Sequence, residues 1–399
     1  MRKTINIGDL GTIITGKTPP TTNKNYYGDY AVFIKPTDIS EHSKYTYETE
    51  EMYSKLAAEK YESSLIPKGA ICVPCIGTVG TKMTMAPCDC YTNQSINSII
   101  CNENYDNEYV YYLIKNFLPG LKAYNLGTAS GREYVSKSNF EKIELVAEQD
   151  KEIQKKIGII LSRYDSLIEN YQKQIKLLEE AAQRLYKEWF VDFRFPGHEN
   201  TTIIDGVPEG WEKKKVNSII ELQSGFAFKS STFDDNGAYK IVTIKNVKDG
   251  AFDGDNVSRI VAIPEKMPKH CVLADGDILL SLTGNVGRVC IVNGKNYLLN
   301  QRVAKLATDY KAFAYCLFRS RDMFIEVNNL ANGAAQQNVS PIRIGEMKIL
   351  LPNNELLQEF ESIARKSIAR IISLQSQHRL LTEARDRLLL KLMNGEIKV

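Results

Sequence analysis

The sequence lacks the features that mark membrane, secreted and strongly charged proteins. No run approaches the roughly 18 apolar residues that a membrane span needs, and the start, Met1-Arg2-Lys3-Thr4-Ile5, carries no apolar signal core. The 51 Lys and Arg residues are almost balanced by 48 Asp and Glu, so the net charge of +3 creates no strong overall field for nucleic acid. We therefore expect a cytoplasmic globular protein whose DNA affinity, if any, comes from local patches or from a partner.

Catalytic signatures are also missing. The four histidines, at positions 42, 198, 270 and 378, are scattered, and no two of them have the spacing of metal ligands. The sequence contains no Gly-x-Ser-x-Gly nucleophile turn and no glycine-rich dinucleotide fingerprint. We therefore predict a binding protein with no catalytic residue, no cofactor and no metal of its own.

The second half of the chain repeats the first. Gly77 matches Gly284 at an offset of 284 − 77 = 207, and Asn93-Gln94 matches Asn300-Gln301 at the same offset. The offset drifts along the chain, as insertions in loops between shared elements would cause. Further matched positions are Gly16 with Gly225, Ile34-Lys35 with Ile244-Lys245, Gly69 with Gly276, Gly80 with Gly287, and Val135-Ser136 with Val339-Ser340.

A long helix is predicted at the end of each repeat. Apolar residues alternate four and three positions apart from Gln149 to about Phe190 and again from Glu355 to Met393, which is typical of a coiled-coil seam. Gln174 and Gln377 hold matching positions, and we expect their amides to meet and fix the register of the helix pair. The predicted seam positions are Ile153, Ile157, Ile160, Tyr164, Leu167, Tyr171, Leu178, Ala181 and Leu185 in the first helix, and Phe360, Ile363, Ile371, Leu374, Leu381, Ala384 and Leu388 in the second.

The repeat predicts an α+β chain in which two pseudo-symmetric mixed α/β domains are separated by two long helices. Such a duplication closes on itself if the helices form an antiparallel coiled coil, with the domains related by a pseudo-twofold axis. The predicted segments are domain 1 at 1–148, the first helix at 149–195, domain 2 with its lead-in linker at 196–353, and the second helix at 354–399. Within the domains, 70–73 and 277–280 read as strands, and 109–116 and 313–319 as helices.

The segment 11–18, Gly-Thr-Ile-Ile-Thr-Gly-Lys-Thr, matches the phosphate-binding P-loop pattern. That pattern works where a strand enters and a helix leaves, so that the helix N-terminus meets the phosphates. Here Pro19-Pro20 follows with no helical period, and the matching stretch 221–229 lacks the Gly-Lys-Thr end. We therefore favour a strand and turn that present Lys17 to DNA, with nucleotide binding as the alternative.

Eight cysteines in a chain of 399 residues without an export signal are expected to be reduced thiols. Cys72 and Cys75, with Cys88 and Cys90, have a spacing that raises the possibility of zinc. At the 207 offset, Cys72 and Cys75 become leucines 279 and 282. Positions that accept leucine are more often packed in a core, so we favour core packing over a metal site.

Polar loops rich in Gly, Asn, Gln, Thr, Lys and Arg recur in both domains. The loops 77–82 and 283–288 can bring backbone close to phosphate, and 127–134 and 332–338 carry side chains that can read base edges. The alternative is that they are solvated turns. Asn93-Gln94 and Asn300-Gln301 lie inside apolar runs, so we expect buried amides that tie loops in place, with direct base contact as the alternative.

In order and duplication, these features resemble the specificity subunit of type I restriction-modification systems, over essentially the whole chain. The residues that carry the resemblance are Thr15-Gly16-Lys17-Thr18-Pro19 and Ser224-Gly225-Phe226, the two Asn-Gln pairs, the segments 184–190 and 208–211, and the ending 389–397. The resemblance implies that each domain reads one half of a bipartite DNA site while the helices set the spacing. It also implies docking of two DNA-adenine methyltransferase (modification) subunits and of restriction subunits, which would hold S-adenosylmethionine, ATP and Mg.

The chain itself is then a non-catalytic recognition subunit for double-stranded DNA. Two other hypotheses stay open: a coiled-coil DNA-binding scaffold or regulator without methyltransferase partners, and a P-loop nucleotide-binding protein. The predicted DNA-binding residues are Lys17, Lys35, Thr78, Lys82 and Arg132 in domain 1, and Lys229, Lys245, Asn285, Arg288, Gln336, Gln337 and Asn338 in domain 2.

Overall fold

The computed structural model describes residues 2–41, 43–125, 127, 133–255, 257–331 and 337–399. The chain divides into two compact units, Met1–Asn170 with Leu380–Val399, and Tyr171–Arg379. Both long helices are shared between the units. Each unit therefore contains one domain, half of the first long helix and part of the second.

The first unit contains two four-stranded sheets, β2-β9-β6-β7 and β3-β5-β4-β8, and a two-stranded β1-β10 pair. All of these pairs are antiparallel except β4 with β8. Strand β6 is buried along its whole length, as its apolar run between Gly69 and Gly77 predicts. The strands are β1 (Arg2–Asn6), β2 (Gly11–Thr15), β3 (Tyr27–Gly28), β4 (Ala31–Ile34), β5 (Met52–Tyr53), β6 (Ile71–Pro74), β7 (Thr84–Met85), β8 (Tyr91–Thr92), β9 (Ile96–Cys101) and β10 (Glu144–Glu148).

The second unit repeats this plan. Its sheets are β14-β21-β18-β19 and β16-β15-β20-β17, with the pairs β13-β22 and β11-β12. Strands β15 and β20 are parallel, as β4 and β8 are in the first unit. The strands are β11 (Ile203–Ile204), β12 (Val207–Pro208), β13 (Glu212–Lys215), β14 (Glu221–Ser224), β15 (Tyr239–Val242), β16 (Ser258–Ile260), β17 (Val272–Leu273), β18 (Ile278–Ser281), β19 (Val289–Ile291), β20 (Tyr297–Leu299), β21 (Val303–Ala307) and β22 (Lys348–Leu351).

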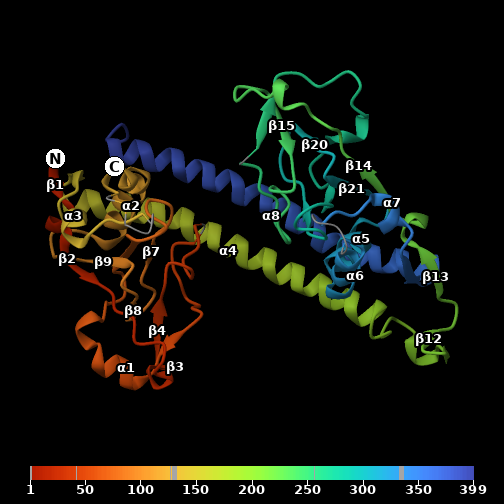
Figure 1. Cartoon of the computed structure of the whole chain (residues 1–399), viewed down its shortest axis with the longest axis horizontal. Coiled ribbons are helices and arrows are strands. Elements are labelled where there is room, and N and C mark those ends of the chain that lie inside the picture. The colour runs from red at the N-terminus through yellow and green to blue at the C-terminus, as the bar shows by residue number, and fades with distance from the viewer. Residues whose placement is uncertain (1, 42, 126, 128–132, 256, 332–336) are drawn as a thin grey trace. The chain divides into compact units, whose positions relative to one another are not determined.

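Short helices connect the sheets, and in the first unit α2 and α3 lie on the side of the long helix, with α1 at the opposite end of the domain (Figure 1). Ser136 and Ser340, matched in the repeat, accept the N–H groups of Asn139 and Arg343 at the starts of α3 and α7. The helices are α1 (Lys55–Lys60), α2 (Asn107–Phe117), α3 (Lys137–Glu141), α4 (Lys151–Phe190), α5 (Lys311–Arg319), α6 (Arg321–Ala331), α7 (Pro341–Gly345) and α8 (Asn354–Asn394). The predicted helices at 109–116 and 313–319 are confirmed.

The two long helices are confirmed as α4 and α8, and within each unit their halves run antiparallel. In the second unit Gln172 Nε2 lies 3.0 Å from His378 Nε2, while Trp189, further along α4, packs on Phe360, earlier in α8. In the first unit Asp165 Oδ1 accepts from Arg385 at 2.6 Å, while Ile157, earlier in α4, lies in the same hydrophobic core as Leu392, later in α8. The fold class predicted from the repeat is therefore confirmed.

The predicted seam is only partly correct. Ile157, Phe360, Ile371 and Leu374 are buried, but the side chains of Leu167 and Ile363 are 40% and 43% exposed. Ala181 and Ala384 are also exposed. Leu161, Ile168, Ala364 and Ile368 are buried instead. Each helix half packs against a domain as well as against its partner helix, so the buried stripe is wider than a heptad seam and turned toward the domain.

Candidate nucleic-acid interface

Three loop segments of the first domain are joined by backbone hydrogen bonds. The Cys75 N–H donates to Ser95 O at 2.7 Å, and the Val135 N–H donates to Cys75 O at 2.8 Å. The Gly77 N–H donates to Glu133 O at 2.9 Å. These bonds place 75–82, 93–95 and 133–135 side by side, and we call this set the first loop edge.

The second domain builds the same arrangement with the same bonds. The Leu282 N–H donates to Arg302 O and the Val339 N–H donates to Leu282 O, both at 3.0 Å. The Gly284 N–H donates to Gln337 O at 2.9 Å. These positions are the repeat mates of those in the first domain, and 282–288, 300–302 and 337–339 form the second loop edge. Two predicted DNA-contacting loops of each domain are thus brought together.

A glycine at the end of β2 or β14 lets that strand end pack closely against the Asn-Gln turn of its domain. A Cβ atom on Gly16 would lie 2.1 Å from Thr92 O, and one on Gly225 would lie 2.2 Å from Asn300 O. Only glycine permits so close an approach of two backbones. The Lys17 N–H then donates to Thr92 O at 2.9 Å. The turn is therefore fixed in place by backbone contacts.

The prediction of buried amides in these turns is wrong for the glutamines. Gln94 and Gln301 are exposed, whereas Asn93 and Asn300 are half-buried. Each asparagine Oδ1 accepts the N–H group two residues further on, at 3.0 Å in the first domain and 3.2 Å in the second. The asparagines therefore shape the turn, as Asn commonly does, and the glutamine side chains face solvent.

The predicted contact residues of the first domain are largely engaged with the protein. Lys17 Nζ donates to Ser63 Oγ at 3.2 Å, and Lys82 Nζ donates to Ile39 O at 3.2 Å. Lys35 Nζ pairs with Glu50 and Glu51 at 2.7 and 3.2 Å. Partial burial lowers the pKa of Lys35, but the hydrogen bonds to these two carboxylates outweigh it and the pKa is raised. Thr78 is half-buried in the first loop edge, and Arg132 lies outside the described residues.

In the second domain the predicted residues are freer. The side chains of Lys229, Lys245, Asn285 and Gln337 are exposed and Arg288 is half-exposed. None of these five makes a side-chain hydrogen bond or ion pair to a described residue. Asn338 Oδ1 accepts from Thr283 Oγ1 at 2.8 Å, which ties two segments of the second loop edge. Gln336 lies outside the described residues.

The P-loop alternative is not supported by the local structure. Gly11–Thr15 is strand β2 itself rather than a loop, and no helix occupies 16–23. A phosphate site at this place would need a helix N-terminus to supply its amides. Lys17 therefore belongs to a strand end and a turn.

The predicted core packing of Cys72 and Cys75 is confirmed. Their exposed fractions are 0% and 2%, and burial raises the pKa of both thiols to about 12. A thiolate is needed to bind zinc, and such thiols stay protonated. Among the described residues, no three His, Cys, Asp or Glu side chains are grouped closely enough to hold a metal ion. In the same part of the chain, no helix is both long and apolar enough to cross a membrane.

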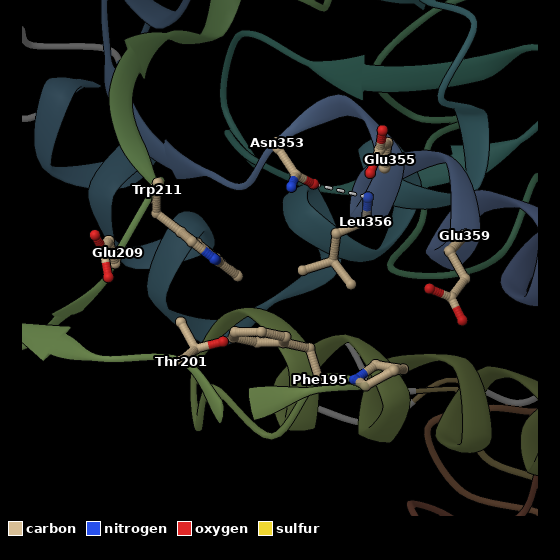
Figure 2. A pocket seen from close by; sticks show the side chains of 10 residues that line it. Phe195, Thr201, Glu209, Trp211, Asn353, Glu355, Leu356 and Glu359 are labelled. Atoms are coloured by element: carbon tan, nitrogen blue, oxygen red, sulfur yellow. Dashed lines mark hydrogen bonds between the residues drawn. The ribbon is translucent and has the colours of Figure 1, made fainter. Parts of the chain in front are cut away.

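Two pockets lie away from the loop edges. One, of about 280 Å³, surrounds the start of α8, where Asn353 Oδ1 accepts the Leu356 N–H at 2.9 Å (Figure 2). Trp211 and Phe195 approach this pocket from the linker side (Figure 2). The other, of about 340 Å³, is lined by residues of α2, β10 and the end of α8. The predicted DNA contacts line neither pocket.

Comparison with known proteins agrees with a double-domain recognition protein. The sequence model of the family described as "Type I restriction modification DNA specificity domain" matches residues 2–180 and 208–377. The MjaIX type I restriction enzyme specificity subunit of Methanocaldococcus jannaschii is 28% identical over 98% of this chain and 93% of its own. The MjaVIII specificity subunit of the same organism is 31% identical over 75% of this chain and 72% of its own.

A solved structure shares the fold. The S subunit of a type I restriction-modification system from M. genitalium superimposes with a TM-score of 0.61 and 17% identity, covering 98% of this chain and 96% of that one. The chain therefore belongs to the family of type I restriction-modification DNA specificity subunits. Membership assigns it DNA sequence recognition and implies a non-catalytic role, and neither the P-loop nor the scaffold alternative is favoured.

Proposed function

We propose that each domain reads one half of a bipartite double-stranded DNA site through its loop edge. The observation that carries this proposal is the repeated backbone framework: equivalent hydrogen bonds join 75–82 to 93–95 and 133–135, and 282–288 to 300–302 and 337–339. Two domains that recognise different base sequences can share one backbone frame but need different side chains on it, because base-edge contacts depend on side-chain type. The first edge carries Thr78, which is half-buried, and Lys82, whose ammonium donates to Ile39 O, and the second carries Asn285, which is exposed, and Arg288, which is half-exposed.

The chemistry of the second loop edge suits groove contacts. Asn285 and Gln337 carry amides that pair well with adenine, and Arg288 carries the fork that pairs with guanine. Lys229 and Lys245, whose ammonium groups have no described partner, would contact phosphates and orient the domain. Together with Lys17 in the first domain, these residues supply local positive charge to a chain whose net charge is only +3, whereas the charge of Lys35 is offset by Glu50 and Glu51.

The two long helices would set the distance between the half-sites and dock two DNA-adenine methyltransferase subunits. Helix α4 has 40 residues, a length of about 60 Å at 1.5 Å per residue. Leu177 on α4 and Leu380 on α8 are 64% and 55% exposed and are repeat mates, 380 − 177 = 203 residues apart. An exposed leucine at the same place in both repeats suits two copies of one partner.

Partner subunits would supply all the chemistry. S-adenosylmethionine would bind the methyltransferases, and ATP and Mg the restriction subunits, in a complex that acts on cytoplasmic DNA. Within this chain, the residues described here serve to bind and to position. This division is consistent with the non-catalytic role that family membership implies.

Methylation mapping tests the proposal. The chain is co-expressed with its modification subunit in a host that lacks other methylation, and methylated adenines are mapped across the genome. The double substitution Asn285→Ala with Arg288→Ala should change or abolish recognition of one half of the split motif. The matched substitution Thr78→Ala with Lys82→Ala should affect only the other half. An unsplit motif, or one in which both variants alter the same half, would refute the proposal.

A further inference from the structure

The turn at 300–302 in the second loop edge holds two adjacent polar side chains on a fixed backbone. The Gln301 N–H donates to Phe226 O at 3.0 Å, the Val303 N–H donates to Asn300 O at 2.9 Å, and Arg302 O accepts from Leu282. Gly225 packs against Asn300 O so closely that no Cβ fits. The backbone of Gln301 and Arg302 is therefore held from both sides before any ligand binds.

The Gln301 side chain makes no hydrogen bond to a described residue, whereas that of its repeat mate Gln94 does. In the first domain Thr18 Oγ1 donates to Gln94 Oε1, which occupies the amide oxygen. The position equivalent to Thr18 is Ala227, at the offset of 209 that relates Gly16 to Gly225, and alanine has no hydroxyl to donate. The Gln301 amide consequently has no described partner.

The next position differs as well. Ser95 in the first domain is matched by Arg302, 302 − 95 = 207 residues later. Arg302 is exposed, and its guanidinium makes no hydrogen bond or ion pair to a described residue. Among the described residues, no carboxylate lies within ion-pair distance of it. An arginine on a rigid turn loses little backbone freedom when it binds, so its planar guanidinium is well placed to recognise a base.

We propose that Gln301 and Arg302 are specificity-determining residues of the second domain, with Arg302 reading a guanine through O6 and N7 and Gln301 reading the neighbouring base. This inference rests on the proposed function and adds a base-reading turn to the loops already assigned. Arginine with guanine and glutamine with adenine are the bidentate pairs that major-groove edges favour. The first domain, with Ser95 and an occupied Gln94, lacks an equivalent guanine reader at this turn.

Methylation mapping of Arg302→Ser, which installs the residue of the first domain, tests the inference. The wild-type motif is determined in the same experiment. We expect one guanine position in one half-site to become relaxed, with methylation at sites carrying another base there rising about tenfold to a hundredfold relative to the preferred site. The other half-site should keep its sequence. A relaxed position that is not a guanine would overturn the assignment.

Arg302→Lys is the matched control, because it keeps the charge but loses the planar fork. If Arg302 reads guanine, Lys should relax the same position less than Ser does, because an ammonium can still donate to O6 and N7. If Arg302 contacts only phosphate, Ser should lower methylation uniformly and relax no base position, which would overturn the inference. Co-purification with the modification subunit shows whether each variant still assembles. If Arg302→Ser does not assemble, the methylation pattern of Arg302→Lys is used in its place. If the wild-type motif is split but neither variant alters it, the proposed function still holds and only this inference is refuted.

Discussion

Two polar side chains, one near the start of each long helix, reach into the adjoining domain. Gln154 Oε1 accepts the Asp106 N–H at 2.9 Å, just before α2. Glu361 accepts the N–H groups of Ala312 and Phe313 at 3.0 and 3.1 Å, in the first turn of α5. They are not repeat mates: at the offset of 203 that relates the two long helices, Gln154 matches Leu357 and Glu361 matches Gly158. Each of these two side chains accepts hydrogen bonds from backbone N–H groups that would otherwise have no acceptor, and this stabilises the fold.

Replacing Glu361 by alanine should destabilise the second unit. The substitution leaves two buried N–H groups at the start of α5 without acceptors, which costs about 1–3 kcal/mol. The loss of stability would appear as faster hydrogen exchange of the α5 amides, measured as a function of denaturant concentration. Glu359→Ala is the control on the same helix, because Glu359 is exposed and its carboxylate has no described partner. An equal loss of stability in both variants would show that the hydrogen bonds from α5 to Glu361 do not stabilise the second unit.

For single residues, burial could be predicted correctly from the sequence where the repeat constrained the position. Cys72 and Cys75 were placed in the core because leucine stands at the matching positions, and both are buried. It failed for Gln94 and Gln301, which were expected to be buried because they lie within apolar runs. A turn between two strands exposes its middle residue whatever the polarity of its neighbours, and no pattern marked these turns. Arg302 was missed for the same reason.

The long helices were predictable as elements, but their buried faces were not. An alternation of four and three fits both a heptad seam and an ordinary helix face over a few turns, since 3.6 residues per turn lies close to 3.5. Because each helix half also covers a domain, residues such as Leu161 and Ile368 are buried beside the expected seam. Helix α6 had no predicted counterpart, since its apolar positions follow α5 after a single residue, Ser320.

The exposed leucines of these helices give a prediction about partner binding. Leu177→Lys and Leu380→Lys should each weaken binding of one methyltransferase copy, and the double variant should lose both, because lysine places a charge where an apolar contact is proposed. Stoichiometry after co-purification, measured by native mass spectrometry, would show two, one and no copies bound.

Leu390→Lys is the matched control for this experiment. Leu390 is 54% exposed on α8, and its repeat mate, 203 residues earlier, is already Lys187. A leucine that one repeat replaces with lysine is not expected to serve both docking sites. Loss of both copies in a single variant, or an equal effect of Leu390→Lys, would argue against one site per repeat.

Over the whole molecule, the duplication fixed the order of sheets and helices, but the two units differ in their buried charges. In the first unit Asp165 accepts from Tyr112 and Arg385, both at 2.6 Å. Burial alone would raise the pKa of Asp165, but the charges of Lys115 and Arg385 outweigh it and the pKa is lowered. The repeat mates of Asp165 and Arg385 are Ile368 and Ala182, so the second unit has no such bridge.

The second unit instead buries Glu179, whose carboxylate accepts from the Tyr315 hydroxyl and lies 3.7 Å from Arg319. Here burial dominates, and the pKa of Glu179 is raised above its usual 4.5 despite both neighbours. A carboxyl group with a lowered pKa stabilises the fold above its unfolded pKa and loses that contribution as pH falls through the folded pKa. One with a raised pKa does the reverse. The contributions of Asp165 and Glu179 to the stability of their units should therefore change in opposite directions as the pH falls.

This contrast predicts opposite effects of two matched amide substitutions. Asp165→Asn should destabilise the first unit at pH 7 by about 1–3 kcal/mol, because Arg385 loses its buried counter-charge, and the deficit should shrink as pH falls below about 4. Glu179→Gln should not destabilise the second unit at pH 7, because the amide oxygen still accepts from Tyr315 without an ionised group being buried. Any gain should vanish as pH falls through the raised pKa of Glu179. Hydrogen exchange of α2 and α5 amides follows the two units separately, which a single melting curve does not. Destabilisation by both substitutions at pH 7 would contradict the assignment for Glu179, and a pH-independent deficit in Asp165→Asn would contradict that for Asp165.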